Sequence, residues 1–177
     1  MAPARLISVI GRQNAGKTTL IVALAQEYTR RKHSVATIKH GHHAALVDTE
    51  GKDTWRHYHE GRADRVLIEA PGERVLFERA PEPQDPVTLA RRFMADADIV
   101  LVEGFHTEPL PKIEVFRRGI GTDLMYRNDR PDRDQWIAIV TDDPSLSADV
   151  PVIRFNDTAW LVTLAGVAWS RALVLSP

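Results

Sequence analysis

Short apolar runs alternate with longer amphipathic stretches along most of this chain. Runs rich in β-branched residues predict strands; they lie at residues 6–10, 34–39, 65–69, 74–77, 98–102, 112–117, 136–140 and 152–155. Stretches with a broad apolar stripe predict helices; they run from residue 19 past 30, from 53 or 54 to about 61, over 87–96, and after 157. This alternation predicts an α/β fold with a mostly parallel central sheet flanked by helices.

Finer features of this pattern predict individual contacts. The Pro71-Gly72 turn between residues 65–69 and 74–77 predicts a β-hairpin extension at a sheet edge. In the 87–96 helix, Leu89, Phe93 and Ala90 are expected to face inward. Helix caps are expected at Asp53 or Thr54 and at Asn156-Asp157. Apolar groups lie on more than one face of the final helix, as core packing or a dimer contact would require (Trp160, Leu161, Leu164, Trp169).

The stretch from Gly11 to Thr18 matches the phosphate-binding pattern G-x-x-x-x-G-K-[ST], and it lies between the first strand and the first helix. Gly11 and Gly16 would let successive N–H groups point at an anion. Lys17 would reach the β- and γ-phosphates, and the Thr18 hydroxyl would bind Mg²⁺. The alternative is that this glycine-rich sequence matches the pattern by chance. Its position between a predicted strand and a predicted helix makes a chance match less plausible.

A nucleotide triphosphatase needs a carboxylate near its metal. Glu103 stands at the carboxyl end of the 98–102 strand, beside the expected phosphate site, whereas Asp98 stands at the opposite end. We therefore predict that Glu103 serves the metal or the attacking water, with Asp48 as a rival metal ligand. A loop acid without function is the other interpretation of Glu103.

Five of the seven histidines lie close together in the sequence: His40, His42, His43, His57 and His59. They could bind a metal, or they could form a polar rim around an anionic ligand. Adjacent histidines diverge in extended backbone and the chain has no cysteine, so the rim is favoured. Nearby basic residues support a phosphate-bearing ligand (Lys39, Lys52, Arg56).

Asp142 follows the 136–140 strand, where guanine-binding folds carry Asn-Lys-x-Asp. A carboxylate there accepts hydrogen bonds from the guanine N1–H and amino group, which adenine lacks. The complete tetrapeptide is absent, so a plain turn before Pro144 is an equally good interpretation.

Bulk properties exclude several classes of protein. The net charge of −1 over 177 residues provides no general field for nucleic acid or an anionic membrane, and the length fits one domain spanning 1–177. The absence of cysteine excludes disulfides and thiolate chemistry. The first strand begins too early for a signal peptide, and polar residues interrupt the apolar stretch 159–175, so we expect a cytoplasmic protein without a membrane span.

Together, these motifs resemble the family of molybdopterin-guanine dinucleotide biosynthesis protein B, a group of P-loop NTPase-like proteins. The resemblance covers roughly residues 5–117 and is carried by the glycine loop, Thr37-Ile38-Lys39-His40-x-His42-His43, Asp48 with Gly51-Lys52-Asp53, Leu101-Val102-Glu103-Gly104-Phe105, and Pro111-Lys112-Ile113-Glu114. The loop departs from the family at Arg12-Gln13-Asn14-Ala15, where smaller residues are expected; these positions contribute backbone, although Arg12 could alter access.

The resemblance implies a homodimer that binds GTP and Mg²⁺ and hydrolyses GTP slowly. Its implied partners are the guanylyltransferase that joins GMP to molybdopterin and the enzyme that inserts molybdenum. We predict that Lys17 and Glu103 act in hydrolysis and that Thr18, Asp48 and Glu103 bind the metal. The predicted ligand-binding set is Gly11, Asn14, Ala15, Gly16, Lys17, Thr18, Thr19, Lys39, His40, His42 and Asp142.

Two other functions remain open from the sequence. A metallochaperone GTPase would load nickel or zinc through the histidines. A small-molecule kinase would use the same glycine loop with an arginine-rich lid, for which the chain offers Arg127, Arg130 and Arg133.

Overall fold

The computed structural model describes residues 3–41, 48–120 and 123–175. The chain divides into two compact units. We call Met1–His40 with Asp85–Pro177 the sheet unit, and Gly41–Gln84 the hairpin unit.

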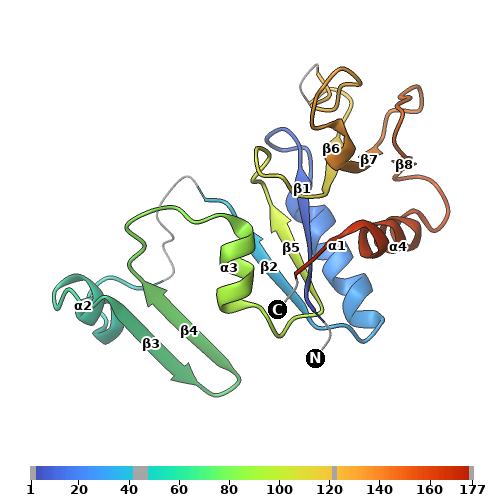
Figure 1. The fold of residues 1–177 in the computed structure, drawn as a ribbon. Helices are drawn as coiled ribbons and strands as arrows, with labels where there is room; N and C mark the ends of the chain where they lie inside the picture. The colour runs from blue at the N-terminus through green and yellow to red at the C-terminus, as the bar shows by residue number, and fades with distance from the viewer. Residues whose placement is uncertain (1–2, 42–47, 121–122, 176–177) are drawn as a thin grey trace. The chain divides into compact units, whose positions relative to one another are not determined.

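A seven-stranded, mostly parallel sheet forms the centre of the sheet unit, in the order β2-β5-β1-β6-β7-β8 (Figure 1). A short last strand pairs antiparallel with β1. The strands are β1 (Arg5–Ile10), β2 (Val35–Lys39), β5 (Ile99–Glu103), β6 (Lys112–Phe116), β7 (Trp136–Thr141), β8 (Val152–Arg154) and β9 (Leu173–Val174). This arrangement confirms the predicted fold class.

Helices cover both faces of this sheet, which explains why four consecutive residues of β5, Ile99 to Val102, are fully buried. On one face, α1 (Lys17–Arg30) and α4 (Trp160–Arg171) enclose a core that includes Leu24 and Leu164. The Tyr28 hydroxyl joins these helices by donating to the Ala165 carbonyl at 2.8 Å. On the other face lies α3 (Pro86–Phe93), and the 3₁₀ helix η1 (Arg133–Gln135) precedes β7.

The hairpin unit contains α2 (Asp53–His59) followed by β3 (Arg65–Ala70) and β4 (Glu73–Glu78). The two strands pair antiparallel, as predicted, around a turn in which Gly72 has a φ of 84°. They form a two-stranded sheet of their own, so the expectation that the hairpin extends an edge of the main sheet was wrong. The hydrophobic pattern predicted that β3 pairs with β4. It does not tell whether such a hairpin also pairs with a strand of another sheet.

The predictions for α3 hold only in part. Ala90 is fully buried and Leu89 packs partly buried against the core, as predicted, but Phe93 is 44% exposed. Pro86 is the other buried residue of this helix. The α3 helix starts one residue earlier than expected, where the Asp85 carboxylate accepts from Val87 N at 2.9 Å and Thr88 N at 3.0 Å. That earlier start accompanies the outward position of Phe93, where the Arg92 guanidinium covers its ring.

The expected helix caps were also wrong. Lys52 precedes α2 and Ala159 precedes α4, and neither helix start is capped by a side chain. The Asp157 carboxylate instead accepts from the backbone N–H of Arg154. Among the described helices, none is long and apolar enough to cross a membrane.

Candidate functional site

The glycine loop, residues 11–18, connects β1 to α1 in a backbone conformation that depends on its two glycines. Gly11 and Gly16 have φ values of 145° and 98°, and Asn14 also has a positive φ of 62°. A Cβ atom at Gly11 would lie 2.4 Å from the carbonyl oxygen of Val115 on the neighbouring strand β6. Gly11 is therefore required by the close approach of β6 as well as by its own φ.

Lys17 is held at the rim of this loop by backbone carbonyls. Its Nζ donates to Gly11 O at 3.0 Å and to Arg12 O at 2.8 Å. Burial lowers the pKa of Lys17, the nearby Glu103 carboxylate opposes that shift, and the positive charge of Lys39 adds to it. Gly16 caps α1 without a side-chain hydrogen bond, so the helix start presents its N–H groups to a ligand.

Glu103 lies directly beside Thr18, as its position at a strand end predicted. The Thr18 hydroxyl donates to the Glu103 carboxylate at 2.9 Å. Lys39 Nζ lies 3.4 Å from the other carboxylate oxygen, because Lys39 and Glu103 are paired in the register of β2 and β5. The carboxyl ends of parallel strands thus gather a hydroxyl, a carboxylate and an ammonium group.

These residues line a cavity of about 430 Å³, which we call the loop cavity. Its lining residues are Gln13, Asn14, Gly16, Lys17, Thr18, Thr19, Lys39 and Glu103. Two ammonium groups suit a phosphate chain, while the Thr18 and Glu103 oxygens are the hard donors that Mg²⁺ prefers. Seven of the predicted site residues therefore line one cavity: Asn14, Gly16, Lys17, Thr18, Thr19, Lys39 and Glu103.

Ser8 and Gly104 support the cavity without lining it, and sequence reasoning did not single them out. The buried Ser8 hydroxyl donates to Gly104 O at 2.6 Å, and Gly104 N donates to Val9 O at 3.0 Å. Gly104 has a φ of 92°. These contacts fix the chain as it leaves β5, directly after Glu103. A polar residue inside an otherwise apolar strand was the available signal for Ser8.

His40 lies near this segment from the end of β2. Its backbone N–H donates to Glu103 O at 3.0 Å, and its ring centre lies 4.7 Å from that of Phe105. His40 is thus in the sheet unit, two strands from the glycine loop. His42 and His43, two further histidines of the predicted rim, lie outside the described residues.

Asp142 follows the predicted strand end but is not among the residues that line the loop cavity. Its carboxylate accepts from Arg118 N at 2.8 Å and lies 3.9 Å from Arg117 Nη1. The Arg117 guanidinium stacks over the Phe155 ring at 4.7 Å and lies 3.8 Å from where a Gly16 Cβ would be. Arg117, which sequence reasoning missed, therefore connects Asp142 to the glycine loop.

Asp48 belongs to the hairpin unit, where its carboxylate accepts from the neighbouring Thr49 N at 2.8 Å. His57 and His59 lie on α2, and the His59 ring packs against Trp55 at 4.6 Å. In the ranges 3–41, 48–120 and 123–175, no three His, Asp or Glu side chains are grouped as a metal site requires. The metal role of Asp48 and of the histidines stays a prediction.

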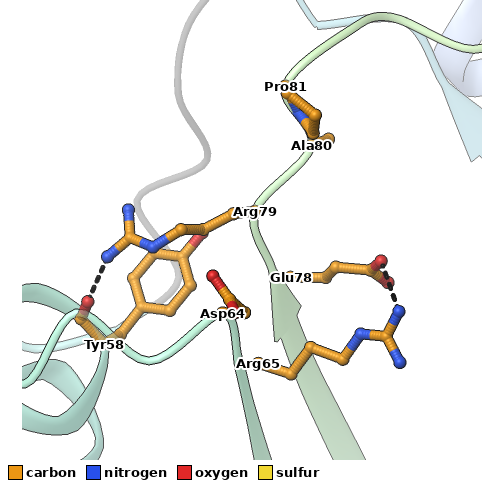
Figure 2. A pocket seen from close by; sticks show the side chains of 7 residues that line it. All are labelled: Tyr58, Asp64, Arg65, Glu78, Arg79, Ala80 and Pro81. Carbon is orange, nitrogen blue, oxygen red and sulfur yellow. Dashed lines mark hydrogen bonds and ion pairs between the residues drawn. The ribbon is translucent and has the colours of Figure 1, made fainter.

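A separate hollow of about 750 Å³ lies within the hairpin unit (Figure 2). The Arg79 guanidinium covers the Tyr58 ring at 4.4 Å and donates to the Tyr58 carbonyl, and Arg65 pairs with Glu78. Its arginines and acids balance one another, and none of the predicted ligand-binding residues lines it. These contacts join α2 to the hairpin.

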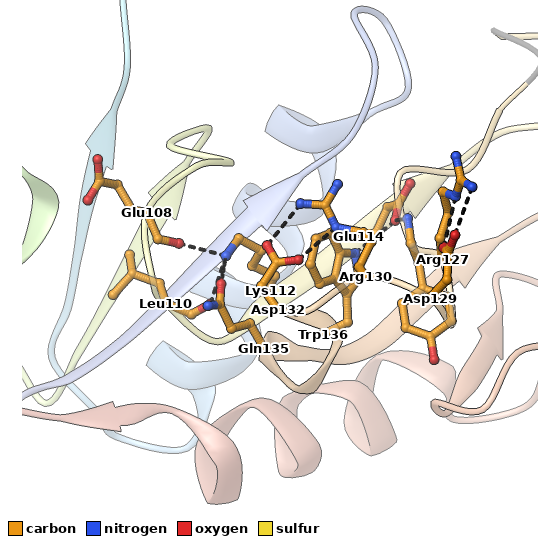
Figure 3. A network of polar contacts seen from close by, with 11 residues as sticks. Glu108, Leu110, Lys112, Glu114, Arg127, Asp129, Arg130, Asp132, Gln135 and Trp136 are labelled. Carbon is orange, nitrogen blue, oxygen red and sulfur yellow. Dashed lines mark hydrogen bonds and ion pairs between the residues drawn. The ribbon is translucent and has the colours of Figure 1, made fainter.

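Two buried charges on β6 anchor the long segment 117–135 (Figure 3). Lys112 is fully buried; its Nζ donates to Glu108 O at 2.6 Å and to the side chain of Gln135, and burial lowers its pKa. Glu114 accepts from Met125 N, Tyr126 N and Trp136 Nε1 at 2.6, 2.8 and 2.9 Å, and burial raises its pKa. The Lys-Ile-Glu motif therefore has a structural role in this protein.

Known proteins match the whole arrangement. The family model of molybdopterin guanine dinucleotide synthesis protein B matches residues 6–142. The molybdopterin-guanine dinucleotide biosynthesis adapter protein of Haemophilus influenzae is 35% identical over 153 residues, covering 85% of this chain and 82% of that protein. The Escherichia coli protein of that name is 31% identical over 168 residues, covering 94% and 93%.

A crystal structure of molybdopterin-guanine biosynthesis protein B has the same fold, with a TM-score of 0.69 at 23% identity over 93% of this chain and 97% of that one. This likeness covers nearly the whole of both chains. The family match spans the glycine loop, Lys39, Glu103 and Asp142. The chain belongs to the family of molybdopterin guanine dinucleotide synthesis protein B.

Proposed function

We propose that this protein is a GTP-binding adapter of molybdopterin guanine dinucleotide biosynthesis that binds GTP with Mg²⁺ and hydrolyses it slowly. The observation that carries the proposal is the pairing of the Thr18 hydroxyl with the Glu103 carboxylate at 2.9 Å, beside Lys17 and the glycine loop. The names of its relatives in Haemophilus influenzae and Escherichia coli support the adapter role.

In this proposal, Lys17 binds the phosphate groups of GTP. Its Nζ exchanges the Gly11 and Arg12 carbonyls for the β- and γ-phosphate oxygens, while the N–H groups at the start of α1 hold the same anion. The lowered pKa of Lys17 reflects burial, which a phosphate charge offsets by favouring the ammonium form. Binding of the anion and full protonation of Lys17 therefore support one another.

Thr18 and Glu103 would hold the metal, since their oxygens already face one another in the loop cavity. Mg²⁺ held there would supply positive charge to offset the negative charge of the phosphates. Glu103 also orients water near its carboxylate, while Lys39 compensates the negative charge at 3.4 Å. Slow turnover is expected because Arg117, whose guanidinium lies 3.8 Å from where a Gly16 Cβ would be, is engaged with Asp142 and Phe155.

We place guanine recognition at Asp142, whose Oδ1 is held by Arg118 N while Oδ2 faces Arg117 at 3.9 Å. Lys39, His40 and His42 would contact a second anionic ligand at the rim. The guanylyltransferase and the molybdenum-inserting enzyme are the proposed partners, and the protein is proposed to act as a homodimer.

The position of the candidate lid weighs against a kinase. None of Arg127, Arg130 and Arg133 is among the residues that line the loop cavity. Arg127 pairs with Asp129 and Arg130 with Asp132, while Arg133 donates to the Asn128 carbonyl. The proposal therefore assigns no acceptor substrate to the glycine loop.

The metal pair supplies the test. Thr18→Val keeps the shape of the side chain but removes the hydroxyl, whereas Thr18→Ser keeps the hydroxyl. We expect Thr18→Val to weaken Mg²⁺-dependent GTP binding by about tenfold, the scale of one charge-assisted contact, and to leave metal-free binding nearly unchanged. Isothermal titration with and without Mg²⁺ measures both. Equal Mg²⁺ dependence in the valine and serine variants would contradict the assignment.

A further inference from the structure

A second basic hollow, about 640 Å³ in volume, lies beside Arg12 of the glycine loop, within the sheet unit. Arg12 enters it from the loop, and Arg127 and Arg130 enter it from the segment after β6. We call this the arginine pocket. The proposed nucleotide site does not use it, because none of its lining residues lines the loop cavity.

Buried hydrogen bonds and aromatic packing hold one wall of the arginine pocket in place. The buried Glu114 carboxylate accepts from the N–H groups of Met125 and Tyr126, and Tyr126 is only 5% exposed. The Arg130 guanidinium lies over the Trp136 ring at 5.0 Å. A buried carboxylate and an aromatic pair thus hold Arg130 in this lining, which it shares with Arg127 and with Arg12 from the glycine loop.

The three arginines of the pocket keep N–H donors that a ligand can use. Arg127 and Arg130 each use Nε and Nη2 to bind one aspartate, Asp129 and Asp132, so each keeps Nη1 for another acceptor. The Arg12 guanidinium has no hydrogen bond or ion pair with any residue of the described ranges. Asp123 is the acid of the lining, and Glu114 stands behind the wall.

We infer that the arginine pocket binds a phosphate monoester of a small organic molecule. Guanidinium groups form charge-assisted, often paired hydrogen bonds with phosphate oxygens, and a dianionic monoester offers three such oxygens to the three arginines. The partly buried Leu124 and Met125 side chains provide an apolar wall for the organic group. This ligand is additional to the nucleotide, and the inference does not depend on GTP binding.

Arg12 also places the two sites next to each other. Its carbonyl accepts from Lys17 Nζ in the loop cavity, while its side chain lines the arginine pocket. A single residue thereby contributes backbone to one anion site and a guanidinium to the other. This explains why a long basic residue in the loop, where the family resemblance led us to expect a small one, has a use.

Phenyl phosphate is a suitable probe, titrated into the Lys17→Ala variant so that the glycine loop contributes little. The signal is the Trp136 indole N–H in ¹H–¹⁵N spectra, because that group donates to Glu114 and its ring underlies Arg130. We expect this resonance to shift saturably, while the indole signals of Trp55, Trp160 and Trp169, the other three of four tryptophans, stay in place.

Adding Arg12→Gln should raise the dissociation constant about tenfold, and adding Arg91→Gln should not change it, although both remove one exposed positive charge. Arg12 makes no side-chain contact that folding needs, so this variant stays interpretable. Loss of all binding in Lys17→Ala would overturn the inference, since the glycine loop would then be the phosphate site. Binding that is equally strong in the Arg12 and Arg91 variants, or that leaves Trp136 unshifted, would overturn it as well.

Discussion

Individual residues around the glycine loop owe their identity to close backbone approaches and to single polar contacts. Gly11, Gly16, Lys17 and Thr18 were predictable because each has a fixed role in the motif. Arg117 was not, because its contact with the loop arises from the pairing of β6 beside β1. Spacing along a sequence identifies residues that act within one segment and misses those that another strand brings in.

The first residue-scale prediction concerns Gly11. Gly11→Ala should destabilise the protein by more than the roughly 1–3 kcal/mol of a strained backbone alone, because the new Cβ would clash with Val115 O. Gly119→Ala is the matched control, since Gly119 also has a positive φ, 84°, but has open space around it. Denaturant unfolding gives both free energies. A smaller effect at Gly11 than at Gly119 would refute the close approach.

Asp142 allows a prediction about base selectivity. Asp142→Asn keeps the size of the side chain and lets one of its two oxygens still accept, but introduces a donor where guanine also has donors. We expect the preference for GTP over ATP to fall about tenfold, with ATP affinity nearly unchanged. Competition binding of the two nucleotides measures the ratio. An unaltered ratio would leave Asp142 as the partner of Arg118 N alone.

At the scale of elements, hydrophobic periodicity predicted the main strands and the first helix, because the central strands are buried on both faces and the helix buries one apolar stripe. It missed β9, since Leu173 and Val174 continue the apolar stretch of α4 without a breaker and turn into a strand that pairs with β1. It also placed the hairpin at an edge of the main sheet. Leu67 and Leu76 are apolar, as side chains covered by a neighbouring element usually are, but they are 58% and 45% exposed.

The contact between α1 and α4 predicts a dependence on pH. Glu27 accepts hydrogen bonds from Arg30 and Arg31, which lower its pKa from 4.5 to about 2, and Arg31 also donates to Val162 O on α4. Because the folded pKa is the lower one, the carboxylate adds stability above about pH 4.5, and this contribution is lost as the pH falls towards about 2.

Glu27→Gln should therefore remove part of the loss in unfolding free energy between pH 4.5 and 2. Glu60→Gln is a matched control, since Glu60 also pairs with an arginine four residues away but its side chain is 52% exposed. Thermal melts across this pH range report the slope. Parallel curves for the wild type and Glu27→Gln would show that the cluster does not couple to folding.

At the scale of the whole molecule, both the family and the fold are those that the sequence motifs predicted, and the family model matches residues 6–142. The sheet unit contains the glycine loop, the Thr18–Glu103 pair and the arginine pocket, and the hairpin unit contains Asp48 and α2. A formal net charge of −1 gives the protein no general attraction for anions, so local arginines and lysines have to provide it. Recognition is therefore expected to depend on a few named side chains.

Titration of the protein with GTP and ATP, each with and without Mg²⁺, tests the central claim most directly. Lys17→Ala removes the ammonium group of the loop cavity, and Lys32→Asn serves as the control, because it also removes one charge and asparagine tolerates the positive φ of 70° at that position. We predict Mg²⁺-dependent binding that prefers GTP, is lost in Lys17→Ala and persists in Lys32→Asn. Preference for ATP, or equal binding by the Lys17→Ala variant, would contradict the proposal.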